Sequence, residues 1–144
     1  MPLRVAVGAD AAGVLPTALV TELREQGADV ALFGALDDGS AEWASIGRAV
    51  GEAVAAGNAD VGVVCCWTGT GISIAANKVR GVRAALCADA VTAQGARRWN
   101  DANVLALSMR ATTPAVGSEI LAMFLSTPAT ADPSERAEIE KLSG

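Results

Sequence analysis

A continuous run of apolar residues that ends in a glycine-rich turn places the strongest limit on how this chain can fold. The run, residues 61–66, has small and β-branched side chains and closes on two cysteines, which is typical of a strand buried on both faces. Gly69 and Gly71 punctuate the turn, and apolar residues from Ile72 to Val79 follow at helical spacing. A strand, a glycine turn and a helix N-terminus form an anion or oxyanion site, because free backbone N–H groups and the helix dipole favour negative charge there.

Strand-like and helix-like segments alternate along the whole chain. Such alternation implies right-handed βαβ crossovers and a parallel sheet with helices on both faces. With 144 residues the chain is long enough for one domain with a sizeable core. The sequence therefore predicts a single domain over residues 1–144 with an α/β fold, a Rossmann-like three-layer α/β/α sandwich around a five-stranded parallel sheet. The strands are expected at residues 3–8, 29–33, 61–66, 83–87 and 104–107.

Polar residues at suitable positions indicate where several helices begin. Ser40, Asp89 and Thr112 or Thr113 can each cap a following helix, and Asp132 begins a capping-box spacing with a proline after it. The helix that starts near residue 132 is polar and is expected to run to residue 142.

Histidine is absent from the sequence, and this excludes several kinds of chemistry. Acid–base catalysis by histidine, metal ligation by histidine, and Ser-His or Cys-His pairs are all ruled out. No metal site and no cofactor are expected. The glycines of the turn do not make a dinucleotide fingerprint, because Ile74 stands where the third glycine belongs.

Charge, hydropathy and cysteine content restrict the partners and the setting. A net charge of −5 without a Lys/Arg cluster argues against nucleic acid. No apolar run approaches the ~18 residues of a membrane span, and a strand that starts at once argues against a signal peptide. Three cysteines, two of them adjacent, do not make a disulfide framework, so a reduced, cytoplasmic setting is expected.

Cys66 is the candidate catalytic group of the turn. Removal of a proton from carbon needs one base of suitable pKa and hydrogen-bond donors for the oxyanion that forms. A thiolate at a helix N-terminus suits that task. The alternative is that Cys66 is a small buried apolar residue, which is how we interpret Cys65 and Cys87.

Four segments together resemble the ribose-5-phosphate isomerase B / galactose-6-phosphate isomerase family. The similarity extends from about residue 3 to about residue 127. The matching segments are residues 7–13, residues 66–78, residues 81–87 with Asp89, and residues 100–107. The resemblance implies an isomerase domain that works as a homodimer or a tetramer, with each active site completed by a partner subunit and the C-terminal helix from about residue 132 packed on that partner.

The resemblance, together with the residues themselves, gives a set of site residues. Cys66 is the expected base, and Thr68 can hydrogen-bond the thiolate or a substrate oxygen, or else serve as a turn hydroxyl. Asp10 is expected to bind a sugar hydroxyl or to cap its own turn. Asn100 corresponds to a substrate-contacting residue donated across the subunit interface, and its alternative is an Asx turn. The remaining substrate-binding predictions are Trp67, Gly69, Thr70, Gly71 and Trp99.

The chain departs from the family pattern where members carry histidine. Ala11, Ala88 and Trp99 occupy three such positions, and the last of them is assigned in the family to opening the sugar ring. Some members lack the cysteine and use a glutamate as base, but Ile72 stands at that position. Arg110 and Arg136 are the candidates for binding a substrate phosphate. They are equally consistent with ordinary surface cations.

The sequence therefore predicts an aldose–ketose isomerase that acts through an enediolate on an atypical or open-chain sugar or sugar phosphate rather than on ribose 5-phosphate. One alternative is a non-catalytic or ligand-binding subunit of a hetero-oligomeric isomerase. Another is anion or nucleotide binding by the glycine turn alone, although the turn lacks the lysine of a phosphate-binding loop.

Overall fold

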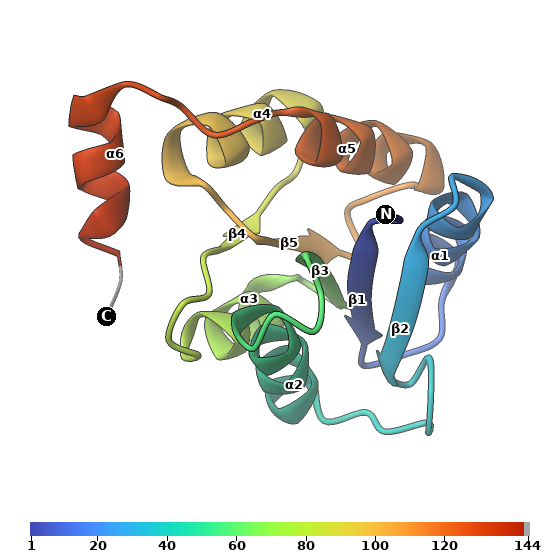
Figure 1. Cartoon of the computed structure of the whole chain (residues 1–144). Helices are drawn as coiled ribbons and strands as arrows, with labels where there is room; N and C mark the ends of the chain where they lie inside the picture. The colour runs from blue at the N-terminus through green and yellow to red at the C-terminus, as the bar shows by residue number, and fades with distance from the viewer. Residues whose placement is uncertain (143–144) are drawn as a thin grey trace.

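Five parallel strands form one sheet, in the spatial order β2-β1-β3-β5-β4 (Figure 1). A computed structural model describes residues 1–142 of the chain. The fifth strand of the sequence lies between the third and the fourth. The connection from β3 to β4 therefore passes the position that β5 occupies. The strands are β1 (Arg4–Ala9), β2 (Asp29–Gly34), β3 (Val61–Cys66), β4 (Ala84–Leu86) and β5 (Val104–Ser108).

Helices cover both faces of this sheet, which confirms the predicted three-layer α/β/α fold (Figure 1). Helices α2 (Trp43–Ala55) and α3 (Thr70–Asn77) pack together on one face. The other face carries α1 (Val14–Glu25), α4 (Ala90–Asn100) and α5 (Pro114–Ser126). The last helix, α6 (Pro133–Glu140), stands at the margin of the molecule and contacts α4 (Figure 1).

Strand β3 is the centre of the core, and all six of its residues are buried. Its side chains alternate between the two faces, as a strand requires. Val63 and Cys65 belong to the apolar cluster under α1, α4 and α5. Val64 and Cys66 belong to the cluster under α2 and α3. The two adjacent cysteines therefore face opposite layers, as predicted.

Three of the predicted helix caps are confirmed. Asp89, Thr113 and Asp132 each accept a hydrogen bond from a backbone N–H of the first helical turn, at 2.7, 3.2 and 2.8 Å. Such caps satisfy N–H groups that have no partner inside the helix. The helix that begins after Asp132 ends at Glu140, slightly earlier than expected.

The cap predicted at Ser40 is wrong, because α2 begins three residues later at Trp43. The backbone N–H of Ser40 donates instead to the side chain of Asp38 at 2.9 Å. This local Asx turn keeps residues 38–40 in a loop and competes with helix formation.

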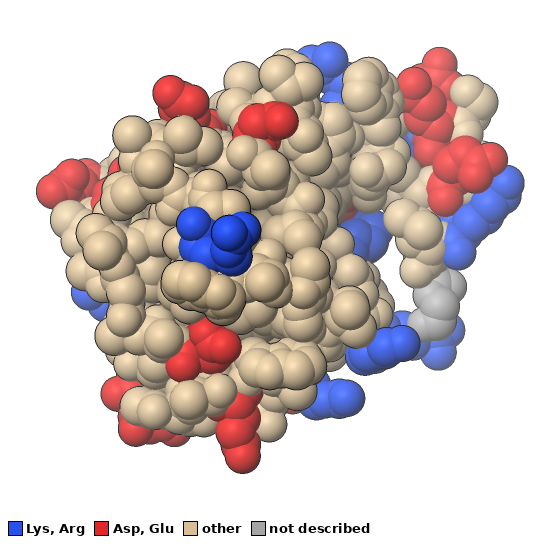
Figure 2. Space-filling model, turned by 180° about the vertical axis from the view of Figure 1, so that it is seen from behind, with Lys and Arg blue, Asp and Glu red and all other residues tan. Residues whose placement is uncertain are grey.

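Charged side chains are dispersed over the surface. On the face seen in Figure 2, wide uncharged areas separate the Lys/Arg and Asp/Glu side chains, and charges of both signs gather around the protruding margin of the molecule. No helix within residues 1–142 has the length and apolar character needed to cross a membrane.

Candidate active site

The carboxyl ends of the parallel strands bring the predicted turn together with polar residues from other strands. Cys66 is the last residue of β3, Asp10 follows β1, and Asp89 caps α4 after β4. We call this side of the sheet the carboxyl edge. Ligands in open α/β sheets bind at such an edge, so the location agrees with the sequence prediction.

The sulfur of Cys66 accepts a hydrogen bond from the turn that follows it. The backbone N–H of Gly69 points at Cys66 Sγ, with a nitrogen–sulfur distance of 3.2 Å. Cys66 is only 5% exposed, and its other neighbours are apolar side chains of the α2/α3 layer. The sulfur is thus covered by the protein and receives a backbone hydrogen bond of the kind that stabilises an anion.

Gly69 adopts a conformation that only glycine accepts easily in this place. Its φ and ψ are 78° and −12°, in the left-handed region. A Cβ at Gly69 would lie 2.5 Å from Leu86 Cδ1 and 2.9 Å from the carbonyl carbon of Leu107. The turn therefore rests directly on β4 and β5, and this close approach fixes the N–H that meets the sulfur.

Thr68 and Thr70 form the outer rim of the turn. Their hydroxyl oxygens lie 2.8 Å apart, and both residues are exposed. Helix α3 starts immediately after Gly69, which has no side chain to cap it, and the N–H of Thr70 donates instead to Thr68 Oγ1 at 3.5 Å. Gly71 lies under the ring of Trp43, because a Cβ there would meet Trp43 Cε3 at 3.0 Å. Hydroxyl groups and an indole ring therefore border the N-terminus of α3.

Two cavities adjoin the turn. The larger, about 470 Å³, lies between the loops after β1 and β5 and is lined by Trp67, Arg110 and mostly small apolar residues. The smaller, about 230 Å³, is lined by Thr68, Cys87 and again Arg110. Cys66 lines neither of them. Arg110 lines both cavities, so it could contact an anion bound beside the turn. The sulfur of Cys66 is reached from neither cavity.

Burial changes the acidity of three groups near the turn. It raises the pKa of the Asp10 carboxyl above its ordinary value, and the backbone hydrogen bond at the same residue opposes the change. Desolvation raises the pKa of the Cys65 thiol to about 12 and that of the Cys87 thiol to about 11. Cys65 and Cys87 are therefore neutral, buried thiols at physiological pH, in agreement with the packing role predicted for both.

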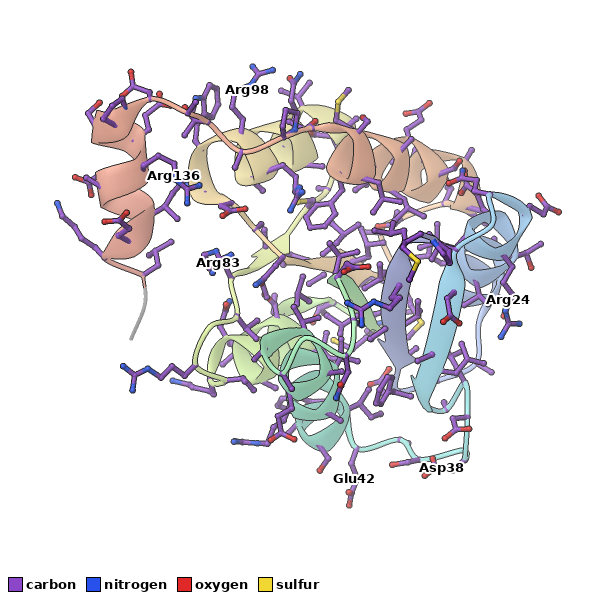
Figure 3. All side chains as sticks on the ribbon, viewed as in Figure 1. Arg24, Asp38, Glu42, Arg83, Arg98 and Arg136 are labelled. Carbon is purple, nitrogen blue, oxygen red and sulfur yellow. The ribbon has the colours of Figure 1, made fainter. Side chains whose placement is uncertain are left out.

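Trp99, Asn100 and Arg136 lie elsewhere. Helix α4 runs back across the sheet, so its last residues reach the side where the strands begin, which we call the amino edge. Trp99 is 53% exposed there, and Asn100 lines a cavity of about 440 Å³. Arg136, on α6, points toward the same region as Arg83 (Figure 3). One chain thus does not bring these three residues to Cys66.

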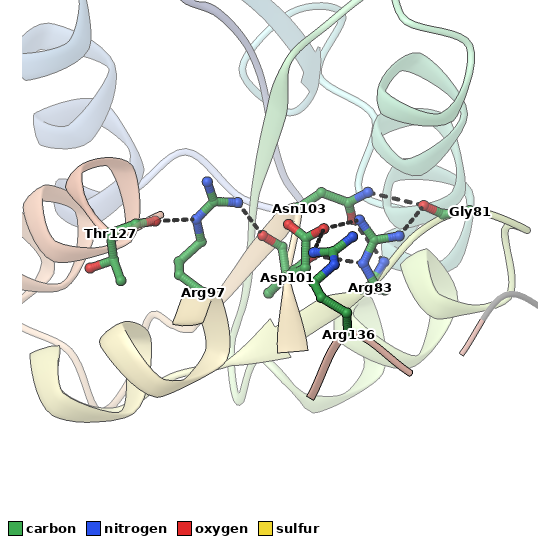
Figure 4. Close-up of polar contacts among 8 residues, drawn as sticks. Gly81, Arg83, Arg97, Asp101, Asn103, Thr127 and Arg136 are labelled. Atoms are coloured by element: carbon green, nitrogen blue, oxygen red, sulfur yellow. Dashed lines mark hydrogen bonds and ion pairs between the residues drawn. The ribbon is translucent and has the colours of Figure 1, made fainter. Parts of the chain in front are cut away.

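A polar network that the sequence did not predict occupies the amino edge (Figure 4). The carboxylate of Asp101 forms ion pairs with two arginines. Its Oδ2 lies 3.6 Å from Arg83 Nη2 and 3.4 Å from Arg136 Nη1. Asn103 accepts the backbone N–H of Arg83 at 2.7 Å and donates to the carbonyl of Gly81 at 2.9 Å. The sequence does hold one indication of this network: Asp101 stands directly after a helix, where glycine is usual. Among residues 1–142 no group of three or more cysteine, aspartate or glutamate side chains is arranged to hold a metal ion.

Comparison with protein families gives a match over nearly the whole chain. The model of the family described as Ribose/Galactose Isomerase matches residues 5–142. Ribose-5-phosphate isomerase B of Escherichia coli is 38% identical over 123 residues, which cover 85% of this chain and 80% of that protein. D-erythrulose-4-phosphate isomerase of Pectobacterium atrosepticum is 34% identical over 125 residues, covering 85% and 82%.

A longer relative and a solved structure complete the comparison. A DNA damage-repair/toleration protein of Arabidopsis thaliana is 40% identical over 130 residues, 88% of this chain, but the match spans only 40% of that protein. The structure of type B ribose 5-phosphate isomerase of Trypanosoma cruzi superposes with a TM-score of 0.92 at 37% identity. That superposition covers 99% of this chain and 95% of the other.

Proposed function

Because this chain belongs to the ribose/galactose isomerase family, we propose that it is an aldose–ketose isomerase that acts on a small open-chain sugar phosphate and uses Cys66 as its base. The observation that carries the proposal is the hydrogen bond from the Gly69 N–H to Cys66 Sγ, at 3.2 Å. The domain that does this work is the single unit of residues 1–144, and we expect it in the cytoplasm.

Cys66 is the best base that the turn offers. The Gly69 N–H and the N-terminus of α3 both stabilise a thiolate at its position. Cys65 and Cys87 are unsuited, because burial holds both thiols neutral at physiological pH. Cys66 is only 5% exposed, so access of a substrate to its sulfur is the decisive property to measure.

The reaction transfers one proton between neighbouring carbons. The thiolate removes a proton from the carbon beside the carbonyl, the electron pair of that C–H bond forms a C=C bond, and the π pair of the C=O bond moves onto oxygen to give an enediolate. The Thr68 hydroxyl and the N–H groups at the start of α3 donate to the developing oxyanion, and Asp10 accepts a hydrogen bond from a sugar hydroxyl. The proton of the neighbouring hydroxyl passes to the enediolate oxygen, the new carbonyl forms at that neighbouring carbon, and the C=C pair takes the proton back from the Cys66 thiol at the former carbonyl carbon.

The absence of a ring-opening group indicates the kind of substrate. Trp99 stands where family members carry the histidine assigned to opening the sugar ring. A four-carbon sugar phosphate has no free hydroxyl able to close a five-membered ring, so it stays open-chain and needs no such group. D-erythrulose-4-phosphate isomerase of Pectobacterium atrosepticum is a 34% identical relative. We therefore propose a short, open-chain sugar phosphate in preference to ribose 5-phosphate.

The complete site is proposed to need two copies of the chain. Cys66, Thr68 and Arg110 lie at the carboxyl edge, whereas Asn100 and Arg136 lie at the amino edge of the same chain. A homodimer in which one amino edge faces the partner's carboxyl edge brings the two groups together around one substrate. In that arrangement Arg110 and Arg136 bind the phosphate, Trp67, Trp99 and the backbone of Gly69, Thr70 and Gly71 line the sugar site, and α6 packs on the partner.

Solvent deuterium uptake tests the proposal. The protein is incubated in D₂O with erythrulose 4-phosphate, unphosphorylated erythrulose or ribose 5-phosphate, and exchange at carbon is followed by NMR. We expect exchange and net isomerisation with erythrulose 4-phosphate, none with the Cys66→Ala variant, and wild-type exchange with the matched Cys87→Ala variant. Undiminished exchange in Cys66→Ala would exclude Cys66 as base, and efficient conversion of ribose 5-phosphate would exclude the substrate preference.

The burial of Cys66 favours a second candidate function, a non-catalytic subunit of a hetero-oligomeric isomerase. Such a subunit has no need for an accessible thiol or for a histidine, and this chain has no histidine. It would bind sugar phosphates without exchanging their carbon-bound protons. Binding by calorimetry together with no deuterium uptake for any of the three sugars would support this candidate over the enzyme.

A further inference from the structure

Asp101 occupies a left-handed position at the end of α4, where glycine is more usual and where a negative charge is unfavourable. It follows α4 with φ and ψ of 48° and 45°, and it is the one residue other than glycine in the described chain with a positive φ. Glycine is the usual residue in this left-handed position. A negative side chain at the end of a helix also opposes the helix dipole. Residues that break local rules are expected where their side chain has another task.

The task visible in the structure is to join three separate elements (Figure 4). Asp101 Oδ2 lies 3.4 Å from Arg136 Nη1 on α6 and 3.6 Å from Arg83 Nη2 at the start of β4. The Asp101 carbonyl accepts a hydrogen bond from Arg83 Nε at 2.6 Å. The Asp101 carboxylate is 28% exposed and Arg83 23%, so this part of the network is more sheltered than an ordinary surface ion pair.

Helix α6 depends on this contact more than a longer helix would. It has eight residues, fewer than the ~12–15 that an isolated helix needs in water. Within residues 1–142, the bond from Arg136 to Asp101 is the side-chain hydrogen bond that links α6 to the rest of the chain. The buried Ile139 adds an apolar contact, and the preceding segment is tied by the Thr130 N–H to the Arg98 carbonyl.

The network around Asp101 carries more positive than negative side chains. Arg83, Arg97 and Arg136 surround the single carboxylate of Asp101. Arg97 is held by the carbonyls of Thr127 and Ala102. Arg136 contacts Asp101 through one of its nitrogens, and a guanidinium has five N–H donors in a fixed fork. Asp101 therefore orients Arg136 without neutralising the group of arginines.

We infer that Asp101 is a positioning residue that docks α6 on the body of the chain and holds the Arg136 guanidinium in the orientation that binds the phosphate of the substrate in the neighbouring subunit's site. The inference rests on the proposed function for the role of Arg136, whereas the docking of α6 is independent of it. Asp101 itself contacts no substrate.

Amide hydrogen exchange and kinetics of matched variants test the inference. Asp101→Asn keeps the size of the side chain and tolerates the left-handed backbone, and Asp101→Gly relieves the backbone while removing the carboxylate. Glu138→Gln is the control, because within residues 1–142 Glu138 pairs only with Lys141, the residue that follows α6. We expect both Asp101 variants to lose at least tenfold in the exchange protection of residues 133–140, and Glu138→Gln to match the wild type.

Kinetics separate positioning from general damage. For erythrulose 4-phosphate, Asp101→Asn should raise KM about tenfold, the effect of losing a well-oriented charge-assisted hydrogen bond, with kcat within about twofold. Exchange into unphosphorylated erythrulose at limiting concentration should stay at the wild-type rate. Adding Asp101→Asn to Arg136→Met should change KM no further, because both act on the same contact.

The outcomes are distinct. Unchanged protection of residues 133–140 in both Asp101 variants overturns the inference, whether or not the protein is active. Lost protection with an unchanged KM overturns the role of Asp101 in phosphate binding. If the wild type turns over no sugar phosphate, the proposed function fails, and the exchange data still decide whether Asp101 docks α6.

Discussion

Replacing Gly69 by alanine tests whether the turn is fixed by close packing against β4 and β5. Gly57 provides a matched control, because both glycines have a φ of 78°. A Cβ at Gly57 meets nothing within 4 Å, whereas a Cβ at Gly69 meets Leu86 Cδ1 at 2.5 Å and the Leu107 carbonyl carbon at 2.9 Å. The Leu86 side chain can move aside, but the backbone at Leu107 belongs to the buried strand β5. The two substitutions thus share the conformational penalty and differ in the steric one.

The expected magnitudes follow from these contacts. Forcing alanine into the left-handed region costs about 1–2 kcal/mol of unfolding free energy, and this is the whole effect expected for Gly57→Ala. Overpacking against β5 adds about 1–3 kcal/mol for Gly69→Ala. The second variant should therefore lose about 2–5 kcal/mol in total. With about 4 °C for each kcal/mol in a chain of this size, it should melt roughly 4–12 °C below Gly57→Ala.

Urea unfolding followed by circular dichroism, at one protein concentration because of the proposed dimer, measures the difference. Activity should diverge further, because a displaced residue 69 takes its N–H away from Cys66 Sγ. Gly57→Ala should keep wild-type kcat. Equal unfolding free energies for the two variants would show that the turn does not rest on β5 as described, and the argument for a fixed N–H at the sulfur would fall with it.

Two further predictions concern the thiols and the acid side of the pH profile. A catalytic Cys66 must be reachable in solution although it is only 5% exposed, so iodoacetamide at neutral pH should modify Cys66 and spare Cys65 and Cys87, whose pKa values burial raises to about 12 and about 11. Mass spectrometry that finds all three thiols unmodified would rule out Cys66 as an accessible base. The backbone hydrogen bond from Thr92 lowers the pKa of Asp89, so this carboxylate stabilises the fold at neutral pH, and its contribution is lost as the pH falls below about 4. Asp89→Asn should therefore unfold more easily than wild type at pH 7, with the gap closing toward pH 3, and a gap that is constant with pH would contradict the assigned cause.

The central part of the fold follows from local pattern. Residues 61–66 are apolar throughout and carry glycines directly after, so the buried strand, the turn and the start of α3 were all predicted. Caps at Asp89, Thr113 and Asp132 were predictable because each is a short polar side chain just before a helix. The cap at Ser40 failed because a neighbouring side chain, Asp38, bonds its N–H first.

Features set by distant parts of the chain were not predictable. β4 begins at Ala84 and not at Arg83, because the N–H of Arg83 donates to the side chain of Asn103, twenty residues later in the sequence. Nothing local specifies that β5 inserts between β3 and β4. Asn100 and Cys66 lie at opposite edges of the sheet, and this separation likewise depends on the direction in which α4 crosses the sheet.

The place of β5 in the sheet has a consequence for the order in which the molecule is assembled. β4 has β5 as its one partner, and β3 pairs with β5 on its outer side. A chain that has emerged only as far as residue 100 holds β1, β2, β3 and β4 but not β5, the strand that pairs with both β3 and β4. The turn at Gly69 then lacks the backbone of Leu107, against which it packs in the complete fold. The turn at Gly69 can therefore reach its packed conformation only after residues 104–108 have inserted between β3 and β4.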